Sequence, residues 1–430
     1  MNVHKPVQRV AIVGTGTIGA SWATHYLVRG FDVTATDPAP TAEAALRSYV
    51  GAAWDAAASI GLAPDASPDR LSFTADLRQA VADADFVQEN APERPELKVR
   101  LFADIDDATP PDAIIASSSS GITMSVIQAE CRRPERTVIG HPFNPPHIVP
   151  LVEVVGGTKT ALETIRDAMS FYAAIGKKPI HLKKELPGHV ANRIQAALYR
   201  EVVHLVQEGV LDVADSDDAV SWGPGLRWGV MGPHLLWHLG GGEGGIQHFM
   251  DTLMPRMVAS WQELGTPEFT PELKEEIVRG VLEEADGHSV DELAARRDAM
   301  LSALLAVRAE YDPSGRVPQP VARRRRDRDT APGETVRARG QQWRSPVLRE
   351  PRRFRQEGPC HRVQAPRRSR RRCRGRAHLL DEHGPSAGER RLDRTRGPGR
   401  RQPDDARSQR RHVHAEAAPL RGHQPEAVLG

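Results

Sequence analysis

Cysteine is scarce in this chain: its 430 residues contain three, at positions 131, 360 and 373. So few and so widely spaced, they exclude a disulfide framework and a cysteine-based metal site, and they favour a reducing compartment. No apolar run approaches the roughly 20 residues that a membrane span needs. The first residues lead into a strand-like segment without the apolar core of a secretion signal. We therefore expect a cytoplasmic protein with no bound metal and no membrane anchor.

Lysine is absent from the last 115 residues, as are asparagine, isoleucine, methionine and tyrosine. From Arg316 onward, 31 arginines stand against 13 acidic residues, although the whole chain has a net charge of only +2. The missing amino acids have A/T-rich codons. We interpret residues 313–430 as a GC-rich gene read in a shifted frame. The alternative is a natural arginine-rich arm that binds nucleic acid, but such an arm has no reason to exclude lysine. In either case we expect disorder.

The first part of the chain alternates short apolar runs with helical patterns. Residues 9–13 form a β-branched run that ends at a glycine, residues 17–29 have helical spacing, and residues 32–36 form a second strand pattern. Further strand candidates are residues 85–88, 113–117, 137–140, 149–155 and 179–182, with helical segments at about 41–59, 95–106 and 123–130. This alternation predicts an α/β fold, a Rossmann-type doubly wound sheet, over residues 1–186.

Pro187-Gly188 interrupts this pattern. The following segments, at about 189–209, 245–263, 270–283 and 290–310, have helical periodicity. We therefore predict a second, mostly α-helical domain over residues 187–312.

A glycine-rich turn, Gly14-Thr15-Gly16-Thr17-Ile18-Gly19, directly follows the first strand and opens the first helix. In such a turn the first glycine permits a tight bend, the second lets the backbone approach a pyrophosphate, and the third lets helix and strand pack closely. Asp37 follows the second strand, where an acid accepts hydrogen bonds from ribose hydroxyls and repels a 2′-phosphate. The context favours NAD as the cofactor over NADP and over a turn without a ligand.

His141 lies in the segment Gly-His-Pro-Phe-Asn-Pro-Pro, and a histidine is the natural base for a hydroxyl proton near neutral pH. A strand–loop–strand return would bring Glu153 beside it, where a carboxylate fixes the imidazole tautomer. The serine run 117–120 ends a predicted strand, where open α/β sheets bind ligands, and Asn192 opens the first helix of the second domain. Each has a structural alternative: a hydrogen-bonding histidine, a solvated glutamate, helix-capping serines or a helix-start asparagine.

Together these motifs resemble the 3-hydroxyacyl-CoA dehydrogenase superfamily over residues 8 to about 310. The resemblance implies that His141 is the general base and that Glu153 pairs with it. It also implies that Ser120 binds the substrate oxygen and that Asn192, in a Pro-Gly-x-x-x-Asn-Arg motif, polarises the same oxygen. It further implies a homodimer formed through the helical domain.

Two other positions match a family segment near the nicotinamide, and the resemblance adds Glu93 and Lys98 to the expected cofactor-binding residues. Ser118 departs from the family, because acyl-CoA enzymes carry asparagine there, which puts an acyl-CoA substrate in doubt. Residues 38–75 also hold only two arginines and no lysine for the phosphates of CoA.

Tryptophan is concentrated in the second domain, at Trp222, Trp228 and Trp237. Aromatic faces bind quaternary ammonium groups by cation–π attraction, whereas the structural alternative is a tryptophan-rich helix core. Residues 223–228 and 240–245 resemble the L-carnitine 3-dehydrogenase group of the superfamily. This implies oxidation of L-carnitine, a small-molecule substrate, by NAD, with Trp228, Phe143 and Tyr199 as candidates for the ammonium group.

Three alternatives remain at this point. An L-gulonate 3-dehydrogenase shares the serine run, and other 3-hydroxy acid or 3-hydroxyacyl-CoA dehydrogenases share the base. A catalytically silent NAD-binding structural protein, as in some lens crystallins, is disfavoured by the presence of His141 and Glu153. Nucleic-acid binding rests on residues 313–430 alone, so we expect no specific nucleic acid partner.

Overall fold

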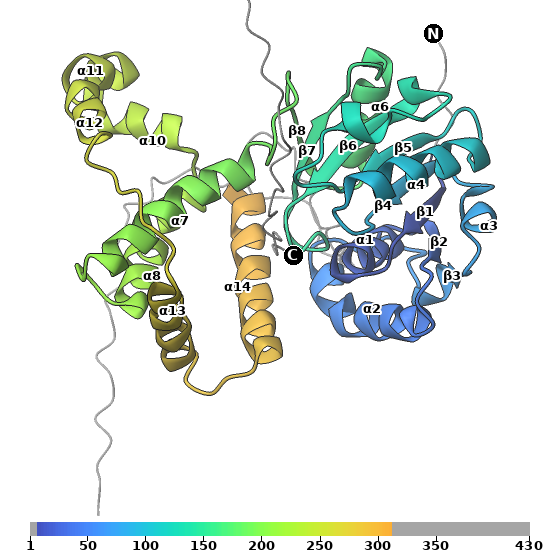
Figure 1. The fold of residues 1–430 in the computed structure, drawn as a ribbon, viewed down its shortest axis with the longest axis horizontal. Coiled ribbons are helices and arrows are strands. Elements are labelled where there is room, and N and C mark those ends of the chain that lie inside the picture. The colour runs from blue at the N-terminus through green and yellow to red at the C-terminus, as the bar shows by residue number, and fades with distance from the viewer. Residues whose placement is uncertain (1–6, 312–430) are drawn as a thin grey trace, which may run out of the picture. The chain divides into compact units, whose positions relative to one another are not determined.

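The computed structural model describes residues 7–311. The predicted disorder and frame shift of residues 313–430 lie outside the described residues. We refer to residues 7–182, which contain all the strands, as the sheet region and to residues 191–311 as the helical region (Figure 1).

The sheet region is built on an eight-stranded sheet in the order β3-β2-β1-β4-β5-β6-β7-β8. Every neighbouring pair is parallel except β6 and β7, which are antiparallel. The predicted doubly wound sheet is therefore confirmed. The strands are β1 (Arg9–Val13), β2 (Asp32–Thr36), β3 (Leu71–Phe73), β4 (Phe86–Glu89), β5 (Ile114–Ser117), β6 (Thr137–Pro142), β7 (Leu151–Val155) and β8 (Lys178–His181).

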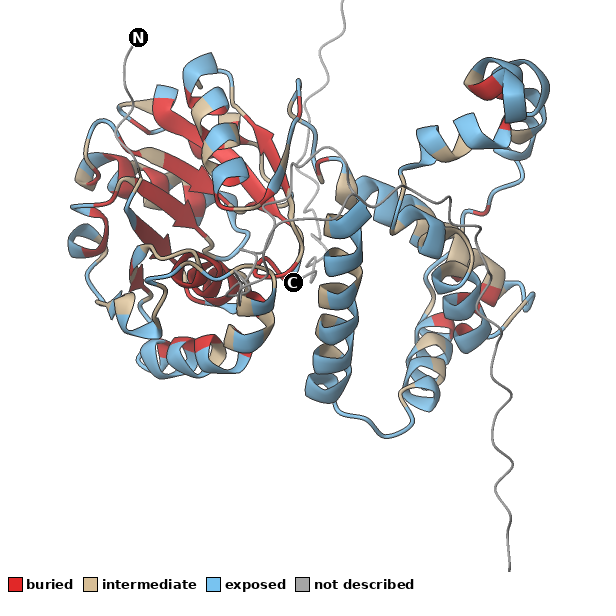
Figure 2. Ribbon diagram, turned by 180° about the vertical axis from the view of Figure 1, so that it is seen from behind, coloured by how far each residue is buried: buried red, intermediate tan, exposed pale blue. Residues whose placement is uncertain are grey.

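Helices cover both faces of this sheet, and the side chains of each strand alternate between the two faces. In β1, Val10 and Ile12 join the core under α1, α2 and α6, whereas Ala11 and Val13 join the core under α3, α4 and α5. Both cores are fully buried (Figure 2). These helices are α1 (Thr17–Val28), α2 (Ala42–Ser59), α3 (Leu77–Val81), α4 (Pro95–Ala108), α5 (Met124–Ile127) and α6 (Leu162–Ala174); short 3₁₀ turns are η1 (Pro68–Arg70) and η2 (Pro134–Arg136).

The helical region contains no strand among its described residues, which confirms the prediction of a mostly α-helical second part. The helix predicted over 245–263 is interrupted at Leu253, because Pro255 lies in the first turn of the next helix and has no N–H to continue the previous one. The elements are α7 (Ala191–Gln207), α8 (Val213–Ser221), α9 (Pro224–Trp228), α10 (Pro233–Gly240), η3 (Gly242–Gly244), α11 (Gly245–Thr252), α12 (Met254–Ser260), α13 (Pro271–Glu284) and α14 (Val290–Tyr311).

Within residues 7–311, none of the helices combines the length and the apolar character needed to cross a membrane.

Candidate active site

The glycine-rich turn lies between the carboxyl end of β1 and the first turn of α1. Gly14 has a φ of +87°, and a Cβ there would approach backbone atoms of Asn90 and Ala91 to 2.9 Å. A Cβ on Gly19 would lie 1.9 Å from the Gly14 carbonyl oxygen, so these two positions require glycine. A Cβ on Gly16, in contrast, would meet no atom within 4 Å. The outer side of the turn is thus open to a ligand that approaches its backbone.

Asp37 lies against this turn. Its Oδ2 accepts a hydrogen bond from the backbone N–H of Thr15 at 2.9 Å, and its Oδ1 accepts one from Ala39 at 2.9 Å. The contact follows from the parallel pairing of β1 with β2, which sets the ends of the two strands side by side. Thr17 and Ile18 begin α1, whose first turn has no acidic residue and no side-chain cap. The residues present therefore fit a dinucleotide, with phosphates at the helix N-terminus and ribose near Asp37.

His141 and Glu153 face each other across the antiparallel strands β6 and β7, where they are directly paired in the register. Nδ1 of His141 lies 2.8 Å from Oε2 of Glu153, and both side chains are buried. Oε1 of Glu153 accepts hydrogen bonds from the backbone N–H groups of Val190 and Ala191 at 2.8 and 3.0 Å. The carboxylate thus connects the sheet to the start of α7.

The charge state of this pair follows from its contacts. Burial alone would raise the pKa of Glu153, but the hydrogen bonds from His141 and from two backbone N–H groups outweigh burial and hold the pKa below the usual carboxyl value. An ionised Glu153 accepts only, so Nδ1 of His141 carries the hydrogen between them. In the neutral imidazole, Nε2 then has a free lone pair, which is the arrangement that a general base needs.

Three of the four serines in 117–120 are used in internal hydrogen bonds. Ser117 Oγ donates to Glu89 at 2.5 Å, Ser118 Oγ donates to Asn90 at 2.7 Å, and Ser119 Oγ donates to Glu93 at 2.6 Å. Ser120 is partly buried, and its hydroxyl makes no hydrogen bond to any residue in the described part of the chain. Among residues 7–311, the Ser120 hydroxyl is thus the one of this run without a hydrogen-bond partner, and it is available to a ligand.

Glu93 and Lys98, both expected near the cofactor, act on the serine loop. Glu93 Oε1 also accepts the N–H groups of Gly121 and Ile122, at 2.7 and 3.1 Å. Burial raises the pKa of Glu93, but the Lys98 charge and these hydrogen bonds outweigh it, so the net shift is downward. Lys98 is 1% exposed, donates to Glu89 at 2.7 Å, and lies 3.6 Å from Glu93. In this arrangement Lys98 fixes the loop after β4.

The remaining predicted site residues make few contacts with the other site residues. Asn192 lies in the first turn of α7, partly buried, with no side-chain hydrogen bond among residues 7–311. Phe143 is partly buried just beyond β6. Tyr199 and Trp228 are 53% and 40% exposed in the helical region, and within the described chain neither ring contacts Phe143. The structure therefore does not bring the three proposed aromatic residues together.

Sequence reasoning missed His189, which is buried beside His141 with a ring-to-ring distance of 4.9 Å. It also missed the buried Glu89 and Gln88, which anchor the serine loop from the end of β4. The signal for His189 was its place directly after Pro187-Gly188, in the same motif as Asn192. Glu89 and Gln88 had no such signal, because their partners lie about 30 residues away in the chain.

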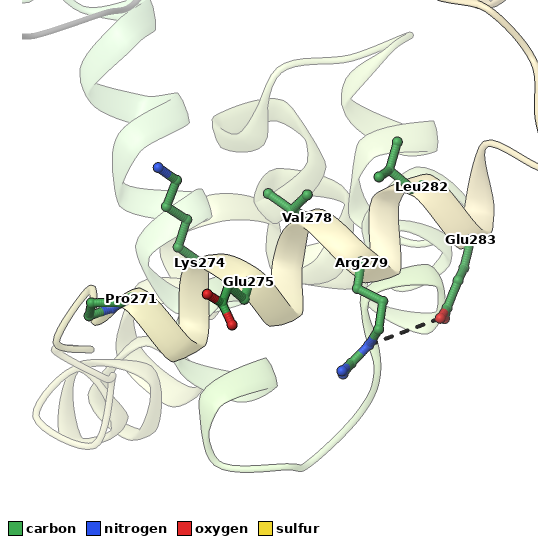
Figure 3. A pocket seen from close by; sticks show the side chains of 7 residues that line it. All are labelled: Pro271, Lys274, Glu275, Val278, Arg279, Leu282 and Glu283. Atoms are coloured by element: carbon green, nitrogen blue, oxygen red, sulfur yellow. Dashed lines mark ion pairs between the residues drawn. The ribbon is translucent and has the colours of Figure 1, made fainter.

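A hollow on the surface of α13 lies apart from these residues (Figure 3). Its lining comes from α13 alone and contains none of the predicted site residues: Pro271, Lys274, Glu275, Val278, Arg279, Leu282 and Glu283. Arg279 pairs with Glu283 at 4.0 Å along the same helix. A single amphipathic helix face of this kind holds no set of convergent groups for chemistry, and we do not assign it to the active site.

Comparison with known proteins agrees with this geometry. Residues 9–186 match the NAD-binding domain of 3-hydroxyacyl-CoA dehydrogenase, and residues 188–270 match its C-terminal domain. L-carnitine dehydrogenase of Streptomyces griseus is 51% identical over 292 residues, which is 68% of this chain and 87% of that protein. L-carnitine dehydrogenase of Bacillus cereus is 45% identical over 307 residues, 71% of this chain and 94% of that protein.

Among solved structures, an NAD⁺-dependent dismutase described as 5-formyl-3-hydroxy-2-methylpyridine 4-carboxylic acid 5-dehydrogenase is similar, with a TM-score of 0.59 and 32% identity. The match covers 72% of this chain and 99% of that one. The phosphate-binding turn, the buried His141–Glu153 pair and the two matched domains lead to one conclusion: the chain belongs to the 3-hydroxyacyl-CoA dehydrogenase family and is an NAD-dependent dehydrogenase.

Proposed function

We propose that this protein oxidises the 3-hydroxyl group of L-carnitine with NAD⁺, to give 3-dehydrocarnitine, NADH and a proton. The observation that carries the proposal is the buried His141–Glu153 pair in a chain that is 51% identical to an L-carnitine dehydrogenase. Bound NAD⁺ supplies the acceptor for the hydride that leaves C3. Nε2 of His141 takes the hydroxyl proton, and the C3–O bond becomes a carbonyl as both hydrogens leave.

Glu153 supports the proton transfer. As His141 becomes an imidazolium, the carboxylate at 2.8 Å stabilises the new positive charge without taking the proton itself. Its hydrogen bonds to the N–H groups of Val190 and Ala191 hold the carboxylate in that orientation. The Ser120 hydroxyl and the Asn192 amide, both without other side-chain hydrogen bonds in residues 7–311, hold the substrate oxygen as the carbonyl forms.

The charges around α2 favour a substrate without CoA. Residues 38–75 contain Arg47 and Arg70 as the only basic side chains. Arg47 pairs with Glu43 at 2.9 Å, and Arg70 lies 3.1 Å from Asp32 and 3.6 Å from Asp65. Both guanidinium groups lie against carboxylates, so this part of the chain offers little net positive charge to the CoA phosphates. For the trimethylammonium group of carnitine we propose cation–π attraction to an aromatic face. Because the structure does not bring Phe143, Tyr199 and Trp228 together, we propose that one of these three residues makes this contact.

We also propose a homodimer formed through the helical region. Trp222 is 75% exposed and Leu226 and Leu239 are largely exposed, and a further apolar face lies along α13 at Val278 and Leu282. Large apolar side chains exposed on several helices of one region are typical of a protein–protein interface. Sedimentation of the full chain should give about twice the chain mass of 47.2 kDa. A single-chain mass at micromolar concentration would contradict this proposal.

The enzymatic test measures NADH formation with three substrates: L-carnitine, L-gulonate and 3-hydroxybutyryl-CoA. We expect turnover of L-carnitine, and turnover of L-gulonate alone would replace our proposal by the runner-up. His141→Ala should lower kcat by about 10²- to 10⁴-fold, the usual contribution of a general base. His181→Ala, at an exposed histidine of β8, is the matched control and should keep the wild-type rate. A His141→Ala variant with near-full rate would remove the proposed base.

A further inference from the structure

His189 is a buried histidine in an unusual backbone conformation, next to the proposed base. It follows Pro187-Gly188, has a φ of +48°, and is 1% exposed. Non-glycine residues seldom adopt this left-handed region and remain there only where their surroundings hold them. The contacts of the His189 side chain must therefore stabilise this backbone conformation.

One ring nitrogen of His189 is bonded and the other is not. Nε2 lies 2.9 Å from the carbonyl oxygen of Ser119, so Nε2 carries the hydrogen and donates it. Nδ1 then has a lone pair, and it is buried without a partner in the described part of the chain. The ring packs against His141 at 4.9 Å between centroids and at 43° between planes. His189 therefore contacts both the proposed base and the serine loop.

The bonded carbonyl belongs to the peptide group that leads into Ser120. Ser119 is held at its hydroxyl by Glu93 at 2.6 Å and at its backbone N–H by Ser117 Oγ at 3.1 Å. The bond from His189 acts on the carbonyl oxygen, and it fixes the plane of the Ser119–Ser120 peptide. Since the Ser120 hydroxyl has no hydrogen bond of its own among residues 7–311, its placement depends on that peptide plane.

We propose that His189 is a positioning residue for the reaction: its Nε2–H orients the peptide that carries Ser120, while its ring supports the imidazole of His141. This inference rests on the proposed function, because both groups that it positions act there. The two residues after His189 donate their N–H groups to Glu153, so the same short segment sets the base, its carboxylate and the serine loop. A displacement of about 1 Å between such groups costs on the order of 10²-fold in rate.

His189 suits this role because its burial favours the uncharged ring. Burial lowers its pKa, the hydrogen bond to Ser119 partly opposes that, and His141, Glu153 and Glu93 are the titratable groups that act on it. A neutral ring beside His141 adds no positive charge that would oppose proton uptake by the base. We therefore expect replacement of His189 to change the rate through geometry and to leave the acid limb of the pH–rate profile in place.

Three substitutions separate the functions of the ring. In His189→Gln the side-chain amide nitrogen takes about the position of Nε2, whereas in His189→Asn it takes that of Nδ1, and Asn tolerates a positive φ better. His189→Phe keeps the shape and has no nitrogen. We expect kcat with L-carnitine to fall about 10- to 100-fold in the Asn and Phe variants and to return to within about threefold of wild type in the Gln variant.

The KM for NAD should stay close to wild type in all three, because the phosphate-binding turn is untouched. Wild-type kcat in His189→Phe, or an equal loss in the Gln and Phe variants, would overturn the proposal, since the Nε2 bond would then have no effect. A parallel loss of NAD binding and kcat would also overturn it, in favour of a purely structural role. If Ser120→Ala and His141→Ala keep the wild-type rate, the proposed function fails, which is a separate result.

Discussion

The sheet region and the helical region differ in how completely they bury their apolar side chains. Two clusters of fully buried residues lie on the two faces of the sheet, with Trp22, Tyr26, Phe86 and Tyr172 among the largest. The apolar residues buried in α7 to α14 are only five: Val203, Val206, Val213, Phe249 and Leu273. α9, α10, α12 and α14 bury no residue at all. The contrast is visible in Figure 2.

This contrast indicates that residues 7–311 complete the core of the cofactor-binding fold but not that of the helical fold. A helix stabilised mainly by tertiary packing needs a buried apolar face, and within the described residues the helices α8 to α13 bury only Val213, Phe249 and Leu273 among their large apolar side chains. A second copy that covers them would supply the missing core. The consequence for function is that the proposed base, the cofactor turn and Phe143 belong to the sheet region, whereas two of the proposed aromatic contacts, Tyr199 and Trp228, belong to the helical region.

The largest expected effect is a difference in the loss of unfolding free energy when each of two leucines is replaced by alanine. Leu46→Ala in α2 removes a fully buried side chain and should cost about 2–5 kcal/mol of unfolding free energy. Leu239→Ala in α10, at 62% exposed, should cost less than about 0.5 kcal/mol at low protein concentration. Urea unfolding of both variants measures this. If a second copy covers Leu239, its cost rises with protein concentration; an equally large cost at every concentration would contradict the comparison.

A smaller effect concerns the buried His147, where the two regions meet. Its Nδ1 lies 2.8 Å from Ser21 Oγ, and its Nε2 lies 3.9 Å from Asp298 of α14. Burial lowers the pKa of His147 to about 4, although the Asp298 charge opposes this. The unfolded chain takes up a proton below about pH 6.5 while the folded chain does not. Folding stability from this residue is therefore lost progressively as the pH falls from about 6.5 toward 4.

The measurement is the unfolding free energy at pH 7.5 and pH 5. This histidine should contribute about 2 kcal/mol to the loss between the two values. His147→Gln should remove that part of the decline, and the exposed His181→Gln should not. An unchanged decline in His147→Gln would mean that His147 is accessible to protons in the folded protein, and the contact between the regions would then be looser than the burial indicates.

The two regions also differed in how far their structure could be predicted. The strands β1 and β2 were predicted with the bounds that the structure has, because a β-branched run ending in a glycine or an acid is a local signal. β3 and α3 were missed, since three and five residues are too short for a periodic pattern. The α8, α9 and α10 helices were missed too, because α8 buries only Val213 and Ser216 and the other two bury no residue, so none of them has a clear amphipathic period.

In the candidate site, too, features with a local sequence signal could be predicted and contacts between distant parts of the chain could not. The position of Glu153 opposite His141 followed from a twelve-residue strand–loop–strand return, and its chemical role remains a prediction. His189 and Glu93 bind the serine loop across 70 and 26 residues of sequence. Such contacts depend on strand order, which no local pattern contains. The hydrogen bonds of Lys98 and of three of the four serines could not be predicted, because their buried partners are distant in the sequence or carry no local signal.

An effect of similar size tests whether cofactor choice is confined to the sheet region. Asp37→Ala removes the carboxylate that accepts the Thr15 and Ala39 N–H groups. It also removes the acceptor that we propose for the ribose hydroxyls of NAD. Hydrogen bonds to a charged group contribute about 1.5–3 kcal/mol, so the preference for NAD over NADP in kcat/KM should fall about 10- to 100-fold. Asp37→Asn keeps one acceptor for the turn but has no charge to repel a 2′-phosphate. Asp37→Asn should therefore lower the preference for NAD over NADP as strongly as Asp37→Ala does, but it should weaken NAD binding less.

Asp32→Ala, at the other end of β2, is the matched control, because it removes an exposed carboxylate that pairs with Arg70 at 3.1 Å. We expect its NAD/NADP ratio to equal that of the wild type. All three variants should keep the wild-type KM for L-carnitine, since the proposed substrate contacts lie elsewhere. An unchanged ratio in both Asp37 variants would show that another group makes the discrimination. A change in the KM for L-carnitine would show that the cofactor turn and the substrate contacts are coupled. Cofactor choice and substrate binding would then not be independent of each other.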